Sequence, residues 1–298
     1  MNDGQLIQIN GKELYIEESK TCDKAVLFLH GGPGESCFDF SYHQTSRLGS
    51  RFRLITLDQR GVCRSEAIKI EESFCLDDLI EDCEELRKHL EIQEWSIIGH
   101  SFGGYLAALY AHRYPNSIEK VIFEAPTFDF ELTGKALLRK TADLFEKYGQ
   151  PHLQEQCMEL ANSSYSPRLL VEGYAELSSF LNDKRMEIYT SNFDNSTDST
   201  VYTENQWEIF YDKSEVHFNR LREEGSIFKS ALHLLKEINI PCLLILGEHD
   251  VVTCPIQIEV FNKDLRQGEV VLIENCGHSP HFETPEQYCE IVTEYLLR

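Results

Sequence analysis

A glycine-rich segment, residues 99–103 (GHSFG), constrains the fold of this chain more than any other. It follows the apolar run 95–98 (WSII) and precedes residues 105–114, whose pattern is helical. A serine between two glycines at a strand-to-helix junction is typical of a nucleophile elbow, which presents the hydroxyl at the carboxyl end of a sheet. Larger side chains in place of the glycines would collide with the adjoining strand and helix. The pentapeptide alone is more often a plain glycine-rich turn, so the prediction that Ser101 is a nucleophile depends on the flanking strand and helix.

The segments around this turn alternate between strands and helices. Strand-like apolar runs occur at residues 25–29, 53–57, 121–123, 241–246 and 270–273. Between them, residues 76–90 carry apolar side chains at helical spacing, and a last helix is predicted to begin near Thr284, where a proline follows a capping residue. Such alternation predicts an α/β fold with a mostly parallel sheet and helices on both faces.

The alternation stops between residues 127 and 239, where helix-like segments follow one another without a convincing buried strand. Residues 192–205 are rich in Ser, Thr, Asn and Asp and predict a loop. We therefore predict a core formed by residues 1–126 and 240–298, with a helical cap, or lid, inserted at residues 127–239.

Composition disfavours several classes of partner. The formal charge is −22, with 28 Lys and Arg against 50 Asp and Glu, which argues against nucleic acid and anionic membranes. No apolar run approaches the length of a membrane span, and residues 1–10 lack a basic and apolar leader, so a cytoplasmic protein is expected. The ten cysteines show no C-x-x-C spacing, which favours reduced thiols packed in the core over a metal or redox site.

Two polar residues follow the last predicted strands, in the order Asp250 and then His278. Because the carboxyl ends of parallel strands meet at one edge of a sheet, Ser101, Asp250 and His278 are expected to come together. In such a triad the imidazole takes the serine proton and returns it to the leaving group, while the carboxylate orients the ring. Taken singly, Asp250 is as readily a helix cap and His278 a structural histidine. Glu248, His249 and His281 lie near Asp250 and His278 in the sequence and are alternatives for these roles, but they follow the strands less directly.

The same edge carries candidate donors for an oxyanion. Phe102 directly follows the serine, and its backbone N–H is one of them. The second is expected from the loop at residues 30–34 (HGGPG), where Gly32 is the candidate because Pro33 has no N–H. The alternative is that this loop is an ordinary turn.

These residues together resemble the α/β-hydrolase superfamily over nearly the whole chain. The HGGPG loop combined with residues 58–61 (DQRG) is similar to the proline iminopeptidase-like subgroup, serine aminopeptidases that release N-terminal residues, often proline, from small peptides. The resemblance implies an eight-stranded sheet, a lid over the site, lid carboxylates that bind the substrate's ammonium group, and no metal or organic cofactor. Cys63 departs from the subgroup, which usually has glycine there, and Phe102 stands where many members have tryptophan.

The predicted lid offers several carboxylates for an ammonium group. Glu208 beside Trp207 would combine charge pairing with a ring face, and Glu204 lies one turn away. Glu172 and Glu176 are more distant candidates. In a chain with 50 acidic residues, any one of them is more often a solvated surface charge.

The sequence therefore predicts a serine hydrolase, with an aminopeptidase acting on a small peptide as the favoured activity. A carboxylesterase, thioesterase or lactonase of the same fold is the alternative, in which the lid pocket is apolar and the amine irrelevant. A binding or signalling protein on this scaffold is a third reading, disfavoured because it would need no complete Ser-Asp-His set. Dehalogenase and epoxide hydrolase chemistry is disfavoured because, by family resemblance, those enzymes carry aspartate at the elbow.

Overall fold

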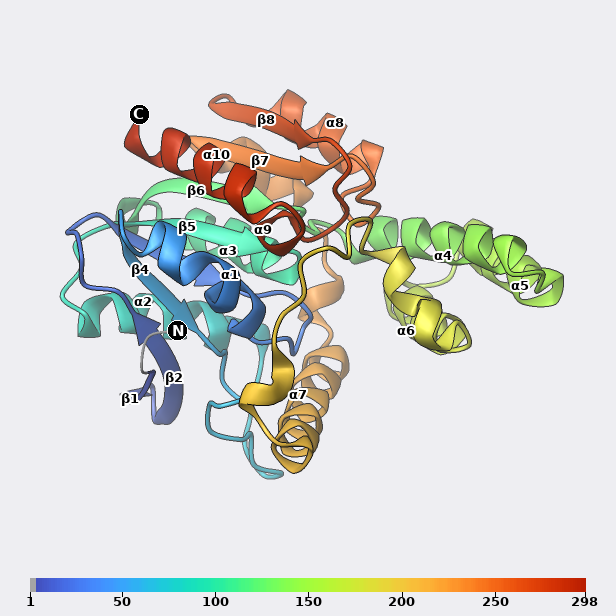
Figure 1. Cartoon of the computed structure of the whole chain (residues 1–298), viewed down its shortest axis with the longest axis horizontal. Helices are drawn as coiled ribbons and strands as arrows, with labels where there is room; N and C mark the ends of the chain where they lie inside the picture. The colour runs from blue at the N-terminus through green and yellow to red at the C-terminus, as the bar shows by residue number, and fades with distance from the viewer. Residues whose placement is uncertain (1–3) are drawn as a thin grey trace.

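A single eight-stranded sheet runs through the centre of the molecule (Figure 1). A computed structural model describes residues 4–298, so the first three residues of the predicted core range 1–126 lie outside the described part. In chain order the strands are β1 (Gln5–Ile9), β2 (Lys12–Glu18), β3 (Ala25–Leu29), β4 (Arg53–Leu57), β5 (Trp95–His100), β6 (Ile118–Glu124), β7 (Cys242–Gly247) and β8 (Gly268–Ile273). Across the sheet they lie in the order β1-β2-β4-β3-β5-β6-β7-β8. Strand β2 is antiparallel to β1 and β4, and the other neighbouring pairs are parallel, which confirms the predicted mostly parallel sheet.

Helices cover both faces of the sheet. They are α1 (Phe38–Leu48), α2 (Leu76–His89), α3 (Phe102–Arg113), α4 (Phe130–Lys147), α5 (Pro151–Asn162), α6 (Pro167–Ser179), α7 (Glu204–Glu224), α8 (Pro255–Asp264), α9 (Pro280–Glu283) and α10 (Pro285–Leu297). Apolar residues of α2, α3 and α8 pack on one face, and those of α1 and α10 pack on the other, in front of the sheet in Figure 1. Within residues 4–298, none of the helices has both the length and the apolarity needed to cross a membrane.

The continuous apolar sequence of β3 follows from burial on both sides. Side chains alternate between the two faces of a strand, and in β3 Val26 and Phe28 join the core under α1 and α10. Leu27 and Leu29 join the core under α2 and α3. A strand with water on one face would alternate with polar residues, so this run places β3 in the middle of the sheet.

The first two strands form a β-hairpin. Ile9 pairs with Lys12, which leaves Asn10 and Gly11 as a two-residue turn. Their φ angles are 47° and 77°, the left-handed conformations that a tight hairpin turn requires and that Asn and Gly tolerate.

Helices α4, α5, α6 and α7 lie between β6 and β7, within the range predicted as a lid. Figure 1 shows α4, α5 and α6 extending away from one side of the sheet, while α7 lies apart from them. The three extending helices share a small apolar core of their own, which includes Leu138, Phe145, Cys157 and Leu170. This separate core explains how the segment keeps its shape away from the main body.

Candidate active site

Ser101 lies at the sharp turn between β5 and α3. Its φ and ψ angles are 54° and −117°, a strained conformation for a residue with a side chain. A Cβ atom on Gly103 would collide with the carbonyl oxygen of Leu29, and one on Gly99 would collide with the carbonyl oxygen of Gly103. The Ser101 N–H donates to the carbonyl oxygen of Glu124 at 3.0 Å, so the end of β6 holds the turn.

Asp250 and His278 meet at the same edge of the sheet. The Nδ1 atom of His278 donates to Oδ1 of Asp250 at 2.8 Å, and both side chains are buried. The Asp250 carboxylate also accepts from the N–H groups of Val252 and Thr253 at 3.1 Å each, which fixes its orientation. Ser101 and His278 line one cavity, so all three residues singled out from the sequence come together.

The glycine loop after β3 lies directly against the serine. A Cβ atom built on Gly31 would be 3.0 Å from Ser101 Cβ, so only glycine fits here without displacement. Gly32 has a φ of 107°, and Phe102 is the first residue of α3. No acceptor within residues 4–298 takes a hydrogen bond from the N–H of Gly32 or of Phe102. Both donors therefore stay available to an oxygen atom of a ligand.

The DQRG segment, residues 58–61, forms hydrogen bonds with this loop. Asp58 is fully buried, accepts from the Cys37 N–H at 3.0 Å and accepts from Nε of Arg64 at 2.6 Å. The ring of His30 accepts from the Gln59 N–H at 3.0 Å. Burial lowers the pKa of His30 to about 4, so the ring is neutral and serves as a fixed acceptor between the two loops.

Cys63 occupies a backbone conformation that explains why glycine is expected there. Its φ is 43°, in the left-handed region where a side chain costs about 1 kcal/mol. Burial raises the pKa of its thiol to about 12, so the group stays protonated and is a poor nucleophile. The side chain forms part of the cavity wall.

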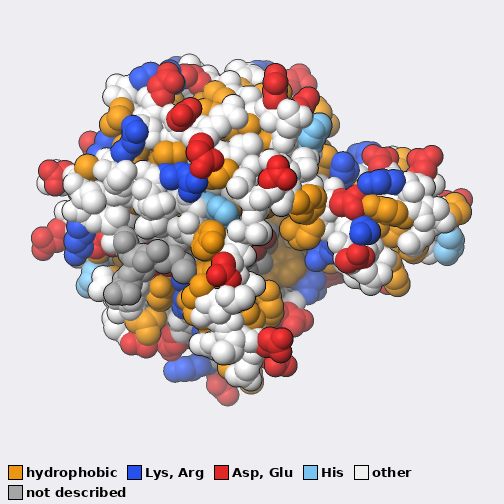
Figure 2. Space-filling view, viewed as in Figure 1, with side chains coloured by type: hydrophobic (Ala, Val, Ile, Leu, Met, Phe, Trp, Pro, Cys, Tyr) orange, Lys and Arg blue, Asp and Glu red, His pale blue; other side chains and the backbone are white. Residues whose placement is uncertain are grey.

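A cavity of about 1090 Å³ extends from Ser101 toward the helices between β6 and β7. Figure 2 shows a hollow between α6 and α7 with hydrophobic side chains inside it. Apolar lining residues include Leu137, Val171, Phe210 and Phe218, whereas lining carboxylates are Glu35, Asp39, Glu204, Glu208 and Asp212. Arg185 is the only Lys or Arg among the lining residues of the described chain. The cavity therefore favours a substrate that is partly apolar and carries positive charge.

The candidate ammonium ligands of the lid do not all reach this cavity. Glu204, Trp207 and Glu208 line it, although both glutamates are also exposed at the surface. The ring of Trp207 packs edge-on against Phe38, with 5.5 Å between centroids. Glu172 and Glu176 do not line the cavity. Glu172 pairs with Arg168 at 2.9 Å instead, because the other face of α6 turns inward.

Sequence reasoning missed a buried glutamate that organises the histidine loop. Glu283, on α9, accepts from the N–H groups of Gly277 at 2.9 Å and of Ser279 at 3.1 Å, on either side of His278. It also accepts from the N–H of Ser191 at 2.9 Å, a residue of the segment between β6 and β7. No local pattern signals such a residue, because the backbone groups that it binds are distant in sequence.

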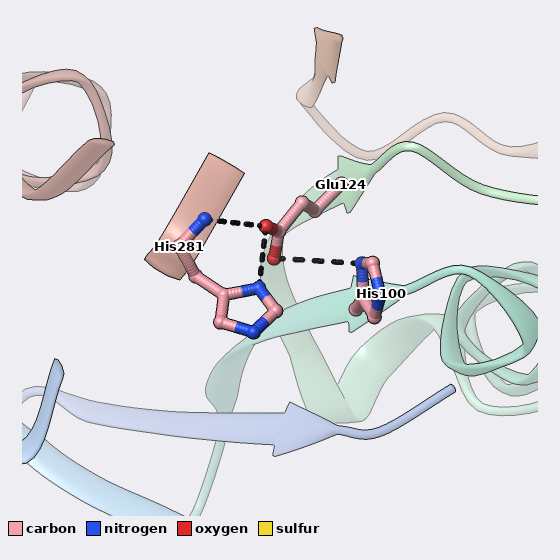
Figure 3. A group of neighbouring side chains, drawn as sticks. All are labelled: His100, Glu124 and His281. Carbon is pink, nitrogen blue, oxygen red and sulfur yellow. Dashed lines mark hydrogen bonds and ion pairs between the residues drawn. The ribbon is translucent and has the colours of Figure 1, made fainter. Parts of the chain in front are cut away.

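A second buried cluster lies behind the histidine loop and comprises His100, Glu124 and His281 (Figure 3). His281 donates to Oε1 of Glu124 from its backbone N–H at 2.9 Å and from Nδ1 at 2.7 Å. The hydroxyl of Tyr288 donates to the other oxygen at 3.0 Å. Burial by itself would lower the pKa of His281, but the Glu124 carboxylate raises it above its usual value.

The donor set of this cluster fits an ion pair better than a metal centre. The candidate ligand atoms lie within 4.8 Å of one another, but both Glu124 oxygens already accept hydrogen bonds from protein donors. His100 Nδ1 is 3.9 Å from Glu124 Oε2. The rings of His100 and His278 are 4.8 Å apart between centroids, so the cluster lies next to His278.

Comparison with known proteins agrees with this geometry. A model of the alpha/beta hydrolase fold matches residues 24–285. A proline iminopeptidase from Heyndrickxia coagulans is 25% identical over 278 residues, covering 91% of this chain and 90% of that protein. The crystal structure of a proline iminopeptidase from Mycobacterium smegmatis has a TM-score of 0.69 at 17% identity, covering 99% of this chain and 97% of that one. A thermophilic esterase from Thermogutta terrifontis has a TM-score of 0.68 at 20% identity, covering 98% of each chain. Because the family model spans most of its length, the chain belongs to the alpha/beta hydrolase fold family, within which it is similar to proline iminopeptidases.

Proposed function

We propose that this hydrolase is a serine aminopeptidase that releases N-terminal residues from small peptides. The observation that carries the proposal is the bond between His278 and Asp250 at 2.8 Å, beside a cavity that also holds Ser101. The similarity to proteins named proline iminopeptidase favours peptides with an N-terminal proline among the substrates.

In the proposed reaction, Ser101 Oγ attacks the acyl carbon of the scissile amide while Nε2 of His278 takes the hydroxyl proton. The carbonyl oxygen becomes an oxyanion, which accepts hydrogen bonds from the N–H groups of Gly32 and Phe102. Such donors contribute about 3 kcal/mol each to the transition state, and the N-terminus of α3 adds its dipole. The intermediate then expels the amine, which receives the proton from His278, and water releases the acyl group by the same steps.

Asp250 has a positioning role in this scheme. Its carboxylate holds the imidazole in the tautomer whose Nε2 faces away from the acid and stabilises the imidazolium when it forms. Residues 127–239 act as the lid, and Glu204, Glu208 and Trp207 are the lid's candidate contacts with the substrate. The apolar wall would accept the side chain of the released residue.

A carboxylesterase, thioesterase or lactonase is the second candidate, favoured by the apolar wall that includes Leu137 and Phe218. For such an enzyme the amino group of the substrate would be irrelevant. The two candidates therefore differ in their response to acetylation of that group, which removes its positive charge and leaves the scissile bond unchanged.

The test compares proline p-nitroanilide, alanine p-nitroanilide, the N-acetyl form of each and p-nitrophenyl acetate with the same purified enzyme. The aminopeptidase proposal expects release from the free-amine amides that acetylation abolishes. Ester cleavage without any amide cleavage would contradict it and favour the esterase. Turnover of none of the substrates, with no labelling by a fluorophosphonate, would favour a binding protein.

A further inference from the structure

One carboxylate of the cavity lies much closer to the nucleophile than the sequence suggests. Glu35 belongs to the loop between β3 and α1, directly after the HGGPG segment. A Cβ atom built on Gly31 would be 2.8 Å from Oε2 of Glu35 and 3.0 Å from Cβ of Ser101. Oε2 of Glu35 and Cβ of Ser101 are therefore no more than 5.8 Å apart, the sum of these two distances.

Glu35 differs from the buried carboxylates near the site because no protein group binds it. Within residues 4–298 the other carboxylates that line the cavity are also without a hydrogen bond or ion pair, and they are Asp39, Glu204, Glu208 and Asp212, so its place beside the serine is what sets Glu35 apart. Asp58, Asp250, Glu124 and Glu283 each accept two or more hydrogen bonds from protein donors. Within residues 4–298, no hydrogen bond or ion pair reaches the carboxylate of Glu35. Its side chain stays open to the solvent of the cavity. The chain therefore places a carboxylate near the proposed nucleophile without a protein counterion.

The surroundings of Glu35 favour a cation as that counterion. Although solvent in the cavity can reach the side chain, the protein atoms packed around it raise the pKa of Glu35 by desolvation, while the nearby ring of His278 acts in the opposite direction. An unpaired carboxylate in such a place gains most from a ligand that carries positive charge and donates hydrogen bonds. A primary or secondary ammonium group does both.

The chemistry of an aminopeptidase substrate requires that ammonium group near the serine. A single carbon atom separates the amino nitrogen from the acyl carbon, and the acyl carbon must approach Ser101 Oγ to about 3 Å. Glu35 lies in that region, whereas Glu204 and Glu208 belong to the first turns of α7, and no distance places them beside Ser101. The position of Glu35 suits the amino terminus, and the positions of Glu204 and Glu208 suit a more distant part of the substrate.

We propose that Glu35 is the specificity-determining residue that binds the substrate's terminal ammonium group, in place of the lid glutamates. This inference rests on the proposed aminopeptidase function. Binding selects acyl groups with a free amine and holds the acyl carbon against the oxyanion donors. It leaves the roles of Ser101, His278 and Asp250 unchanged.

The first experiment measures kcat/KM for alanine p-nitroanilide and for p-nitrophenyl acetate in the wild type and in Glu35→Gln, Glu204→Gln and Glu208→Gln. Glu35→Gln keeps the shape of the side chain and removes its charge. The ratio of the two constants should fall about tenfold to a hundredfold in that variant, as expected for losing one charged hydrogen bond. Because His278 acts on both substrates, an indirect effect through the base would lower both constants and leave the ratio unchanged.

Glu176→Gln is the matched control, since Glu176 is exposed on α6 and does not line the cavity. It removes the same charge from the molecule and should leave the ratio within about twofold of the wild type. Circular dichroism and fluorophosphonate labelling of each variant establish that the fold and the serine are intact. A ratio that falls in Glu204→Gln or Glu208→Gln but persists in Glu35→Gln would overturn the inference.

A second experiment does not depend on peptide hydrolysis. Pyrrolidinium chloride and the neutral analogue cyclopentanol are compared as inhibitors of p-nitrophenyl acetate hydrolysis at constant ionic strength. The wild type should be inhibited more strongly by the cation, and Glu35→Gln should lose that difference. If the wild type cleaves no amide but shows this Glu35-dependent inhibition, the peptidase proposal fails and the cation site stands. If free-amine amides are cleaved and pyrrolidinium inhibits Glu35→Gln as strongly as the wild type, the peptidase proposal stands and the cation site fails.

Discussion

The carbonyl oxygen of Tyr189 accepts a hydrogen bond from the backbone N–H of His278 at 2.7 Å. Tyr189 follows the short 3-10 helix Asn182–Ile188, in the segment between β6 and β7. This backbone hydrogen bond joins the proposed lid to the proposed base. The rings of Tyr189 and His278 also lie 5.6 Å apart between centroids. Any movement of the lid at this point reaches the loop that carries the base.

Glu283 strengthens this junction, and replacing it should loosen both sides. In Glu283→Gln the side-chain N–H₂ would face backbone N–H groups that now donate to Glu283. The remaining backbone N–H groups would keep an oxygen acceptor but lose its negative charge. We expect a loss of about 3 kcal/mol in the free energy of unfolding and a lower kcat for every substrate. Urea denaturation and steady-state kinetics measure the two effects. The control is Glu286→Gln, at an exposed surface pair with Arg47, which should change stability by less than about 1 kcal/mol. Equal effects of the two variants would refute this role.

Asp250→Asn tests the orienting role of the carboxylate. The amide N–H₂ can donate to Nδ1, which favours the wrong tautomer of His278 while preserving the packing. We expect kcat to fall by about 10⁴-fold with little change in the melting temperature. Kinetics with the best substrate and thermal unfolding provide the comparison. A variant that keeps more than about a tenth of wild-type kcat would show that another group orients the base.

Buried histidines make the fold sensitive to acid. Burial lowers the pKa of His217 to about 3, and its Nδ1 donates to the carbonyl oxygen of Arg60 at 2.8 Å. The unfolded chain has a histidine pKa of about 6.5. Between that pH and the folded pKa, His217 is protonated in the unfolded chain but neutral in the folded one. Stability should be complete above pH 6.5 and fall as the pH drops toward 3, with a slope of up to about 1.4 kcal/mol per pH unit.

His217→Asn keeps a donor near the Nδ1 position and removes the titration. The variant should lose less stability than the wild type between pH 6.5 and 4.5, measured by urea denaturation at each pH. His281, whose pKa is raised, contributes the opposite slope, because its stabilisation is complete below pH 6.5 and is lost as the pH rises through its folded pKa. It is present in both proteins and cancels in the difference. Parallel pH profiles would contradict the assignment.

The backbone at Cys63 predicts an unusual order of stability. Alanine is normally the more stable substitution at a buried site, because glycine has more freedom in the unfolded chain. At a φ of 43° the preference reverses, and Cys63→Gly should be about 1 kcal/mol more stable than Cys63→Ala. Thermal or urea unfolding of the two variants decides the order. Greater stability of Cys63→Ala would show that side-chain packing outweighs the backbone strain.

The parts of this site that the sequence predicted are those that follow strands. Ser101, Asp250 and His278 each come directly after an apolar run, and parallel strands bring their carboxyl ends to one edge. The loop at residues 30–34 also follows a strand, so Gly32 was a candidate oxyanion donor, whereas the close approach of Gly31 to the serine emerges only from the structure. These features depend on local chain direction and on the order of strands.

The remaining parts depend on packing between distant segments, which no local pattern reports. Glu283 binds backbone groups about 90 positions away, at Ser191 and Asn192. Glu35 stands out only because the folded chain brings its carboxylate close to Ser101. Glu172 does not line the cavity because the rotation of α6 about its axis buries Leu170 and Tyr174 instead.

Covalent labelling shows whether Ser101 is an activated nucleophile, as the proposed mechanism requires. The protein is treated with a fluorophosphonate probe, digested, and the modified residue is located by mass spectrometry. We predict stoichiometric labelling at Ser101 in the wild type, none in Ser101→Ala, and labelling slowed by more than about a hundredfold in His278→Ala. An unmodified Ser101 in folded protein, or equal labelling of Ser101→Ala at another residue, would contradict the account.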